Sequence, residues 1–190
     1  MMKKMSEDTE VFPGDEVAVE EEYLASDGTF AADGKVYASQ IGTLVLDDND
    51  CVAKVISPNP PNILHIGDIV YAVVADIRKT MVTADVAAKQ GTDREVGGET
   101  YATIHVSKIS SGYTDNIRNE LRKGDLIRAR VIDTEPSLQL TTKENHFGVI
   151  RAKCGMCKTE LVRRGDDLFC PECRHTQSRK LADDYGNVEL

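Results

Sequence analysis

The sequence has no tryptophan, few other aromatic residues and no long apolar run. Aromatic residues make up 5 % of its 190 residues. A membrane-spanning helix needs about 20 consecutive apolar residues, so we expect no membrane-spanning segment. The N-terminal stretch MMKKMSEDTEVFPGDE has two lysines but no apolar core behind them, unlike a secretory signal. These absences predict a soluble protein without membrane association. Five cysteines, four of them in metal-type spacing, predict the reducing cytoplasm rather than a disulfide framework.

The sequence motifs of the common enzyme classes are also missing. There is no G-x-x-x-x-G-K-[ST] phosphate loop, no G-x-G-x-x-G dinucleotide fingerprint and no G-x-S-x-G nucleophile elbow. Acidic clusters at 47–50 and 166–167 fall in expected hairpin turns, where acidic residues are favoured for local backbone reasons. The sequence therefore predicts a protein that is not an enzyme.

Negative charge is concentrated in the N-terminal third of the chain. The net charge is −9, and residues 1–60 alone hold 13 acidic and 4 basic residues, a local charge of −9. Residues 61–190 hold 19 of each sign. Within them, residues 143–180 hold 9 basic and 5 acidic residues, an excess of +4. Attraction for a polyanion is therefore expected behind the N-terminal third.

Two breaks divide the chain into three blocks. The stretch SPNPPN (57–62) has three prolines in six residues and predicts a stiff linker. The stretch KENHFGVIRAK (143–153) leads into a cysteine-rich segment. We therefore expect domains at 1–60, 61–148 and 149–190 in an all-β chain.

The first block predicts a small β domain. Asp33-Gly34 suits the tight turn of a hairpin, and residues 42–57 predict a second hairpin with an acidic turn. Cys51, near this turn, is interpreted as a strand residue. A core drawn from about 60 residues is marginal alone, so this block is expected to pack against another domain or protein.

The middle block contains five short runs with alternating or β-branched residues, which predict strands. Residues 114–125 predict a short helix, with Thr114 or Asp115 as the N-cap and Gly124 at its end. Five strands with a helix between the third and fourth are the pattern of a five-stranded OB barrel. The five runs are 67–77, 81–88, 101–107, 125–133 and 138–142.

The third block holds four of the five cysteines in the stretch CGMCKTELVRRGDDLFCPEC (154–173). Two C-x-x-C pairs allow two tight turns whose sulfurs point at one tetrahedral metal ion. The spacer between the pairs predicts a hairpin with its turn at 164–167. A segment of about 40 residues lacks the core to fold unaided, so the pattern predicts a structural zinc ribbon. The expected zinc ligands are Cys154, Cys157, Cys170 and Cys173.

Other uses of these cysteines fit the sequence less well than structural zinc. A thioredoxin-type redox pair needs a surrounding βαβ pattern, which the sequence lacks. A catalytic zinc would leave one position open to water, whereas four thiolates close the shell. Iron in the same geometry stays an open alternative. His146 and His175 flank the block and are surplus as ligands.

The middle block resembles the ribosomal S1-type RNA-binding domain, a member of the OB class. The resemblance rests on the stretches GDIVYAVVADI, ATIHVSKIS, LRKGDLIRARVID and LQLTTKE. The family's second strand usually exposes two phenylalanines, but here Thr80 and Thr83 occupy those positions. Without base stacking we expect weak, mainly electrostatic RNA binding. The RNA-binding residues, which could equally be solvated surface residues, are His105, Lys108, Arg78 and Lys79.

The first block resembles the N-terminal domain of exosome cap subunits. The matching motifs are Pro-Gly-Asp at 13–15, Gly-Thr-Phe at 28–30 and Gly-Lys-Val-Tyr-Ala-Ser at 34–39. With an S1-type barrel and a four-cysteine ribbon behind it, the whole chain resembles the Csl-type cap subunit of the archaeal RNA exosome.

This resemblance implies a non-catalytic accessory subunit that helps guide RNA into a 3′-to-5′ phosphorolytic ring. Its implied partners are RNase-PH-like ring subunits, the other subunits of a trimeric cap, a primase-like protein and single-stranded RNA. The alternative is a transcription- or translation-associated factor, because S1-type barrels and zinc ribbons recur there. The N-terminal motifs argue against that alternative.

Overall fold

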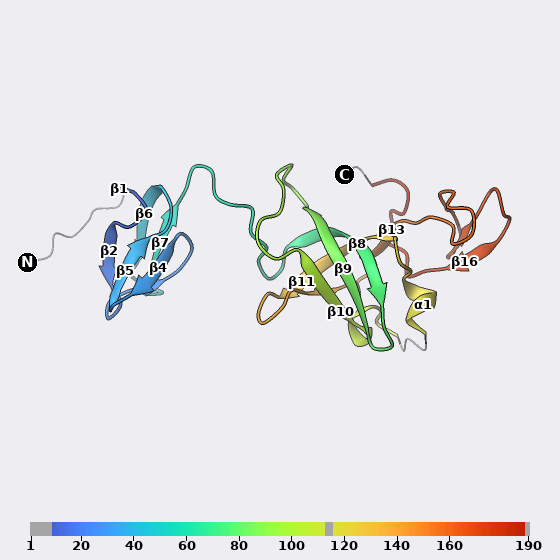
Figure 1. The fold of residues 1–190 in the computed structure, drawn as a ribbon, viewed down its shortest axis with the longest axis horizontal. Helices are drawn as coiled ribbons and strands as arrows, with labels where there is room; N and C mark the ends of the chain where they lie inside the picture. Colours follow the sequence, from blue (N-terminus) through green and yellow to red (C-terminus); the bar gives the residue numbers. More distant parts are fainter. Residues whose placement is uncertain (1–8, 113–115, 189–190) are drawn as a thin grey trace, which may run out of the picture. The chain divides into compact units, whose positions relative to one another are not determined.

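The computed structural model describes residues 9–112 and 116–188, and almost all of their regular structure is β (Figure 1). The all-β fold predicted from the sequence is confirmed. The chain separates into two compact units between Pro61 and Asn62, within the proline-rich stretch. No helix among the described residues is long and apolar enough to cross a membrane.

The N-terminal unit consists of two small sheets that share one core. Alternate residues of its strands point inward, as in β5, where Val36 and Ala38 are fully buried. Leu44 and Val55 from the other sheet pack in the same cluster. One sheet has the order β1 (Glu10–Val11), β6 (Gly42–Asp47), β7 (Val52–Ile56) and β3 (Leu24–Ala25), and the other has β2 (Glu16–Val19), β5 (Lys35–Ala38) and β4 (Thr29–Ala32).

Both predicted hairpins of this unit are present. Asp33 and Gly34 join β4 to β5 with φ of 52° and 75°, and this left-handed pair matches the twist of the strands. In the second hairpin Asp47 pairs with Val52, which leaves Cys51 in the turn. The interpretation of Cys51 as a strand residue is therefore wrong. Its φ of 51° places it in the left-handed region, where strand pairing cannot continue.

The middle of the chain forms a closed five-stranded barrel. Its strands follow the order β8, β9, β10, β12 and β11, and the barrel closes because β11 pairs with both β12 and β8. The β10–β12 pairing is parallel, whereas the others are antiparallel. This is the predicted OB arrangement. The strands are β8 (Ile69–Ile77), β9 (Met81–Lys89), β10 (Tyr101–His105), β11 (Leu126–Asp133) and β12 (Gln139–Thr141).

A short helix, α1 (Ile117–Glu120), lies between β10 and β11 as predicted, after a 3-10 turn, η1 (Val106–Lys108). The Asn116 side chain caps α1 by accepting the N–H of Arg118. The two predicted caps, Thr114 and Asp115, lie outside the described residues. The helix ends before Gly124, which has φ of 87° in the turn that leads into β11.

The C-terminal segment is built onto the barrel. The strand β13 (Gly148–Arg151), in the stretch interpreted as a boundary, pairs with β11 and widens the barrel sheet. Behind it, β14 (Val162–Arg164) and β15 (Asp167–Phe169) form the predicted hairpin, and β16 (Thr176–Ser178) adds an unpredicted third strand. Buried residues of the barrel and the ribbon belong to one hydrophobic cluster.

Candidate metal centre and nucleic-acid interface

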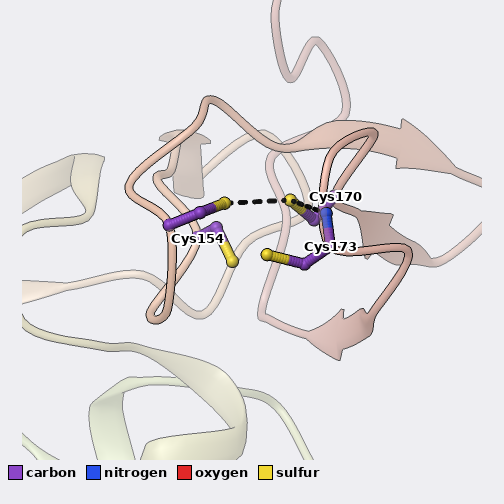
Figure 2. Close-up of side chains that lie close together, drawn as sticks. Cys154, Cys170 and Cys173 are labelled. Atoms are coloured by element: carbon purple, nitrogen blue, oxygen red, sulfur yellow. Dashed lines mark hydrogen bonds between the residues drawn. The ribbon is translucent and has the colours of Figure 1, made fainter.

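The two C-x-x-C turns have the same backbone geometry. In the first, the N–H of Lys158 donates to the carbonyl of Cys154 at 3.1 Å, and in the second the N–H of Arg174 donates to that of Cys170 at 2.9 Å. Lys158 and Arg174 both have left-handed backbones, with φ of 65° and 58°. This repeated turn aims two pairs of sulfurs at one space (Figure 2).

The structure brings the four predicted cysteine ligands together. All four sulfurs lie within 4.8 Å of one another, and Sγ of Cys157 is 3.5 Å from Sγ of Cys170. A tetrahedral ion with metal–sulfur bonds of about 2.3 Å has sulfur–sulfur edges of about 3.8 Å. The cluster therefore fits one metal ion held by four thiolates.

The pKa values of the cysteines also indicate that the cluster binds a cation. The neighbouring sulfur of Cys157, together with burial, raises the pKa of Cys173 to about 12. At the other side, the hydroxyl and backbone of Thr159 lower the pKa of Cys157 to about 6. Four sulfurs this close cannot all be thiolates unless a cation compensates their charge. A bound metal ion supplies that compensation.

A second candidate surface lies at the end of the β8–β9 hairpin. Arg78 and Lys79 border a hollow of about 620 Å³ that also contacts α1. A second hollow of about 470 Å³ shares Ile77 and Arg118 with the first, so the two are adjacent. We call this surface the basic groove; its basic residues are Arg78, Lys79, Arg118, Arg122 and Lys123.

Sequence reasoning found only Arg78 and Lys79 of the basic groove. The other three basic residues come from α1 and the turn after it, and only the folded barrel places them beside the hairpin. One acidic residue, Asp76, also borders the groove and lies 3.9 Å from Nε of Arg78.

His105 and Lys108 are exposed but do not line the basic groove. His105 pairs with Met81 on β9, at the same barrel end as the hairpin that carries Arg78. Its Nδ1 lies 2.8 Å from the hydroxyl of Ser107. The backbone of Lys108 is fixed because its carbonyl accepts hydrogen bonds from β12 and the residue after it. Its side chain is left to the solvent.

The outward face of β9 and β10 has one exposed aromatic residue that the sequence analysis missed. Tyr101 is 48 % exposed and lies four residues from His105, on the same side of β10. Thr83, one of the two positions that lack a phenylalanine, is buried and its hydroxyl bonds the carbonyl of Asp76. Because side chains of a strand alternate between its two faces, Tyr101 is expected on the same exposed face as His105, and this pattern could have identified it from the sequence.

Comparison with known proteins places this architecture in a family. Residues 11–47 match the family model described as the exosome complex exonuclease RRP4 N-terminal region. Over 180 residues the chain is 39 % identical to the exosome complex component Csl4 of Archaeoglobus fulgidus, a match that covers 94 % of this chain and 98 % of that protein. The chain therefore belongs to the family of the exosome component Csl4.

A solved structure is similar over a smaller part of the chain. The intact alpha subunit of aIF2 from Pyrococcus abyssi matches with a TM-score of 0.36 and 23 % sequence identity. The match covers 44 % of this chain and 30 % of that subunit.

Proposed function

We propose that this chain is a non-catalytic cap subunit of an RNA exosome, which helps guide RNA into a 3′-to-5′ phosphorolytic ring. The observation that carries the proposal is the 39 % identity with an exosome component along 94 % of the chain. The match of residues 11–47 to an exosome N-terminal region agrees with it. We also propose a cytoplasmic location.

The N-terminal unit is proposed to dock on RNase-PH-like ring subunits, as one of three cap subunits. Its acidic charge disfavours contact with RNA, because residues 1–60 hold 13 acidic against 4 basic residues. Its core is small, and a docking partner would cover more of its apolar surface. Large apolar side chains that it exposes are Phe12, Leu24, Phe30, Ile41 and Ile56.

The barrel is proposed to bind single-stranded RNA weakly. The basic groove can neutralise phosphates, and Lys108 with His105 extends the basic surface along the same barrel end. Tyr101 offers one ring for base stacking, at a position other than those of the missing phenylalanines. Three such weak sites around one pore would raise the effective local concentration of RNA.

The ribbon is proposed to bind zinc through Cys154, Cys157, Cys170 and Cys173. The ion would hold the two C-x-x-C turns together and so stabilise a segment with little core of its own. We also propose a primase-like partner protein, which would cover the exposed Met156 and Val162 of the ribbon.

Reconstitution with a purified RNase-PH-like ring tests the proposal. We expect the chain to bind the ring, to raise the rate at which the ring degrades a single-stranded RNA in phosphate buffer, and to degrade none without the ring. An Arg118→Ala and Lys79→Ala double variant should bind the ring normally but lose most of the rate increase. Failure to bind the ring, or RNA degradation by the chain alone, would contradict the proposal.

A further inference from the structure

A chain of polar contacts runs from the barrel to the cysteine cluster. It begins at Asp125, the residue before β11, whose side chain is 2 % exposed. Asp125 accepts a hydrogen bond from Nε of Arg179 at 2.7 Å, and the side chain of Arg179 is fully buried. The same carboxylate oxygen accepts the backbone N–H of Arg122 at 2.8 Å. This ion pair therefore fixes Arg179, from the segment after β16, against the turn that precedes β11.

The next link is Gln177 on β16, whose amide has one possible orientation. Its Oε1 accepts hydrogen bonds from Nη1 of Arg122 at 2.8 Å and from Nη2 of Arg179 at 3.1 Å. Guanidinium groups only donate, so the oxygen of the amide must face both arginines. The amide nitrogen of Gln177 must then point the other way.

That nitrogen points at a sulfur. Nε2 of Gln177 lies 3.5 Å from Sγ of Cys154, and Cys154 is fully buried. A thiolate that ligates a metal carries negative charge, and an N–H donor stabilises that charge. Partners that hydrogen-bond the ligands of a metal typically change its affinity by about 10- to 100-fold.

We propose that the barrel completes the metal centre of the ribbon, with Gln177 as the positioning residue that donates to the Cys154 thiolate and Arg122 as the barrel residue that orients it. The inference rests on the proposed metal binding by the four cysteines. It means that the affinity for the metal depends on a residue of the barrel, which holds the amide of Gln177. The backbone supports the same link, because the N–H of Lys180 donates to the carbonyl of Glu120 in α1 at 2.8 Å.

Two substitutions in the full-length protein test this assignment. Gln177→Leu removes the donor to sulfur while keeping a side chain of similar size. Arg122→Leu leaves Gln177 in place but removes the group that holds its amide. Arg122 is only partly buried, so its loss should leave the fold intact. The matched controls are Lys123→Leu, an exposed neighbour in the same turn, and Ser178→Ala, an exposed neighbour on β16.

The first measurement is competition for Zn²⁺ with a chromophoric chelator. We expect Gln177→Leu to lower the affinity about tenfold or more and Arg122→Leu to lower it several-fold, with both controls within twofold of the unsubstituted protein. The second measurement is the absorption of the Co²⁺-loaded protein. Loss of an N–H donor makes the sulfur easier to oxidise, so the thiolate-to-Co²⁺ band should move to longer wavelength in Gln177→Leu.

The outcomes separate this inference from the proposed function. If the unsubstituted protein bound neither Zn²⁺ nor Co²⁺ with thiolate absorption, the proposed metal centre would fail and the inference with it. If it bound both ions while Gln177→Leu and Arg122→Leu matched their controls in affinity and in the Co²⁺ spectrum, only the inference would be overturned.

Discussion

Arg128 on β11 holds Asp184, near the C-terminus, through two hydrogen bonds. Its Nη1 and Nη2 donate to the two carboxylate oxygens of Asp184 at 2.8 and 2.7 Å. Arg128 also donates to the carbonyl of His146, and its side chain is only 10 % exposed. This arginine therefore fastens the last described segment of the chain to the barrel wall.

Asp184→Asn should destabilise the protein by about 1–2 kcal/mol, because it leaves a mostly buried arginine without its paired charge. The loss is modest because the Asp184 side chain is 39 % exposed, so water screens part of the interaction. Urea unfolding of the unit that holds the barrel would measure the loss. Asp183→Asn is the control, since Asp183 lies farther from Arg128, at 3.4 Å, and is more exposed.

Because of the Arg128–Asp184 pair, the free energy of unfolding should decrease at acidic pH. Partial burial acts to raise the pKa of Asp184, but the hydrogen bonds and charge of Arg128 outweigh it and lower the pKa. A carboxyl with a lowered pKa in the folded state stabilises that state above its unfolded pKa, about 3.9. This contribution is lost as the pH falls through the lower folded value. The stability difference between the protein and Asp184→Asn should therefore shrink below about pH 4; a constant difference down to pH 2 would contradict this.

If the basic groove contacts RNA phosphates, its charges should make the affinity for RNA decrease with salt concentration. Each phosphate contact to single-stranded RNA contributes about 0.7 to the slope of log affinity against log salt. Arg118→Ala and Lys79→Ala should each reduce the slope by about that amount. Lys54→Ala, in the N-terminal unit, is the control and should change nothing. Unchanged slopes for both groove variants would place the RNA elsewhere.

Tyr101 is expected to stack on a base. Tyr101→Ala should weaken binding of a short single-stranded RNA by about 1–3 kcal/mol, whereas Tyr101→Phe should bind as well as the unsubstituted protein. Fluorescence anisotropy at low salt measures both. Equal binding by the alanine and phenylalanine variants would mean that the ring is a surface residue only.

Removal of the metal should affect the two units differently. Chelation, or Cys154→Ser, is expected to loosen the ribbon and the barrel residues packed against it, because they share one hydrophobic cluster. The N-terminal unit has a separate cluster and should keep its protection against hydrogen exchange. Cys51→Ser, in an exposed turn, is the matched control without effect. Loss of protection in the N-terminal unit after chelation would contradict the separation of the two cores.

Gly28 is the glycine of the Gly-Thr-Phe motif, and its substitution should be costly. A Cβ at this position would lie 2.4 Å from Nε2 of Gln40 and 2.6 Å from the carbonyl of Val55. Gly14 has a similar positive φ but open space around it. Gly28→Ala should therefore cost about 2–4 kcal/mol, from backbone strain and a clash with main chain, against about 1–2 for Gly14→Ala. Equal losses in thermal or urea unfolding would show that the close approach is relieved without strain.

The sequence predicted those features that depend on local pattern. The alternation of apolar and polar residues predicted the five strands of the barrel, and Asp33-Gly34 predicted a hairpin turn. The cysteine spacing predicted that the four sulfurs lie close together. Features set by tertiary packing were missed. The strand β13 is short, and it pairs because β12 covers only the second half of β11 and leaves residues 126–128 open. No local pattern connects Gln177 with Arg122, 55 residues earlier in the chain.

The basic groove shows the same division. Arg78 and Lys79 lie in a hairpin that the sequence pattern predicts. Arg118 lies near them because the folded barrel brings α1 next to that hairpin, which no sequence pattern indicates. A resemblance can place motif residues, such as His105, but it cannot place side chains that the motif does not contain.

The association of this chain with an exosome ring is tested most directly by affinity capture from the native lysate at moderate salt, with the captured proteins identified. The account predicts RNase-PH-like ring subunits in fixed proportion to the tagged chain. It also predicts that a variant lacking residues 1–61, the unit with its own core, captures none of them. Capture of polymerase or ribosomal proteins in place of the ring would contradict the account.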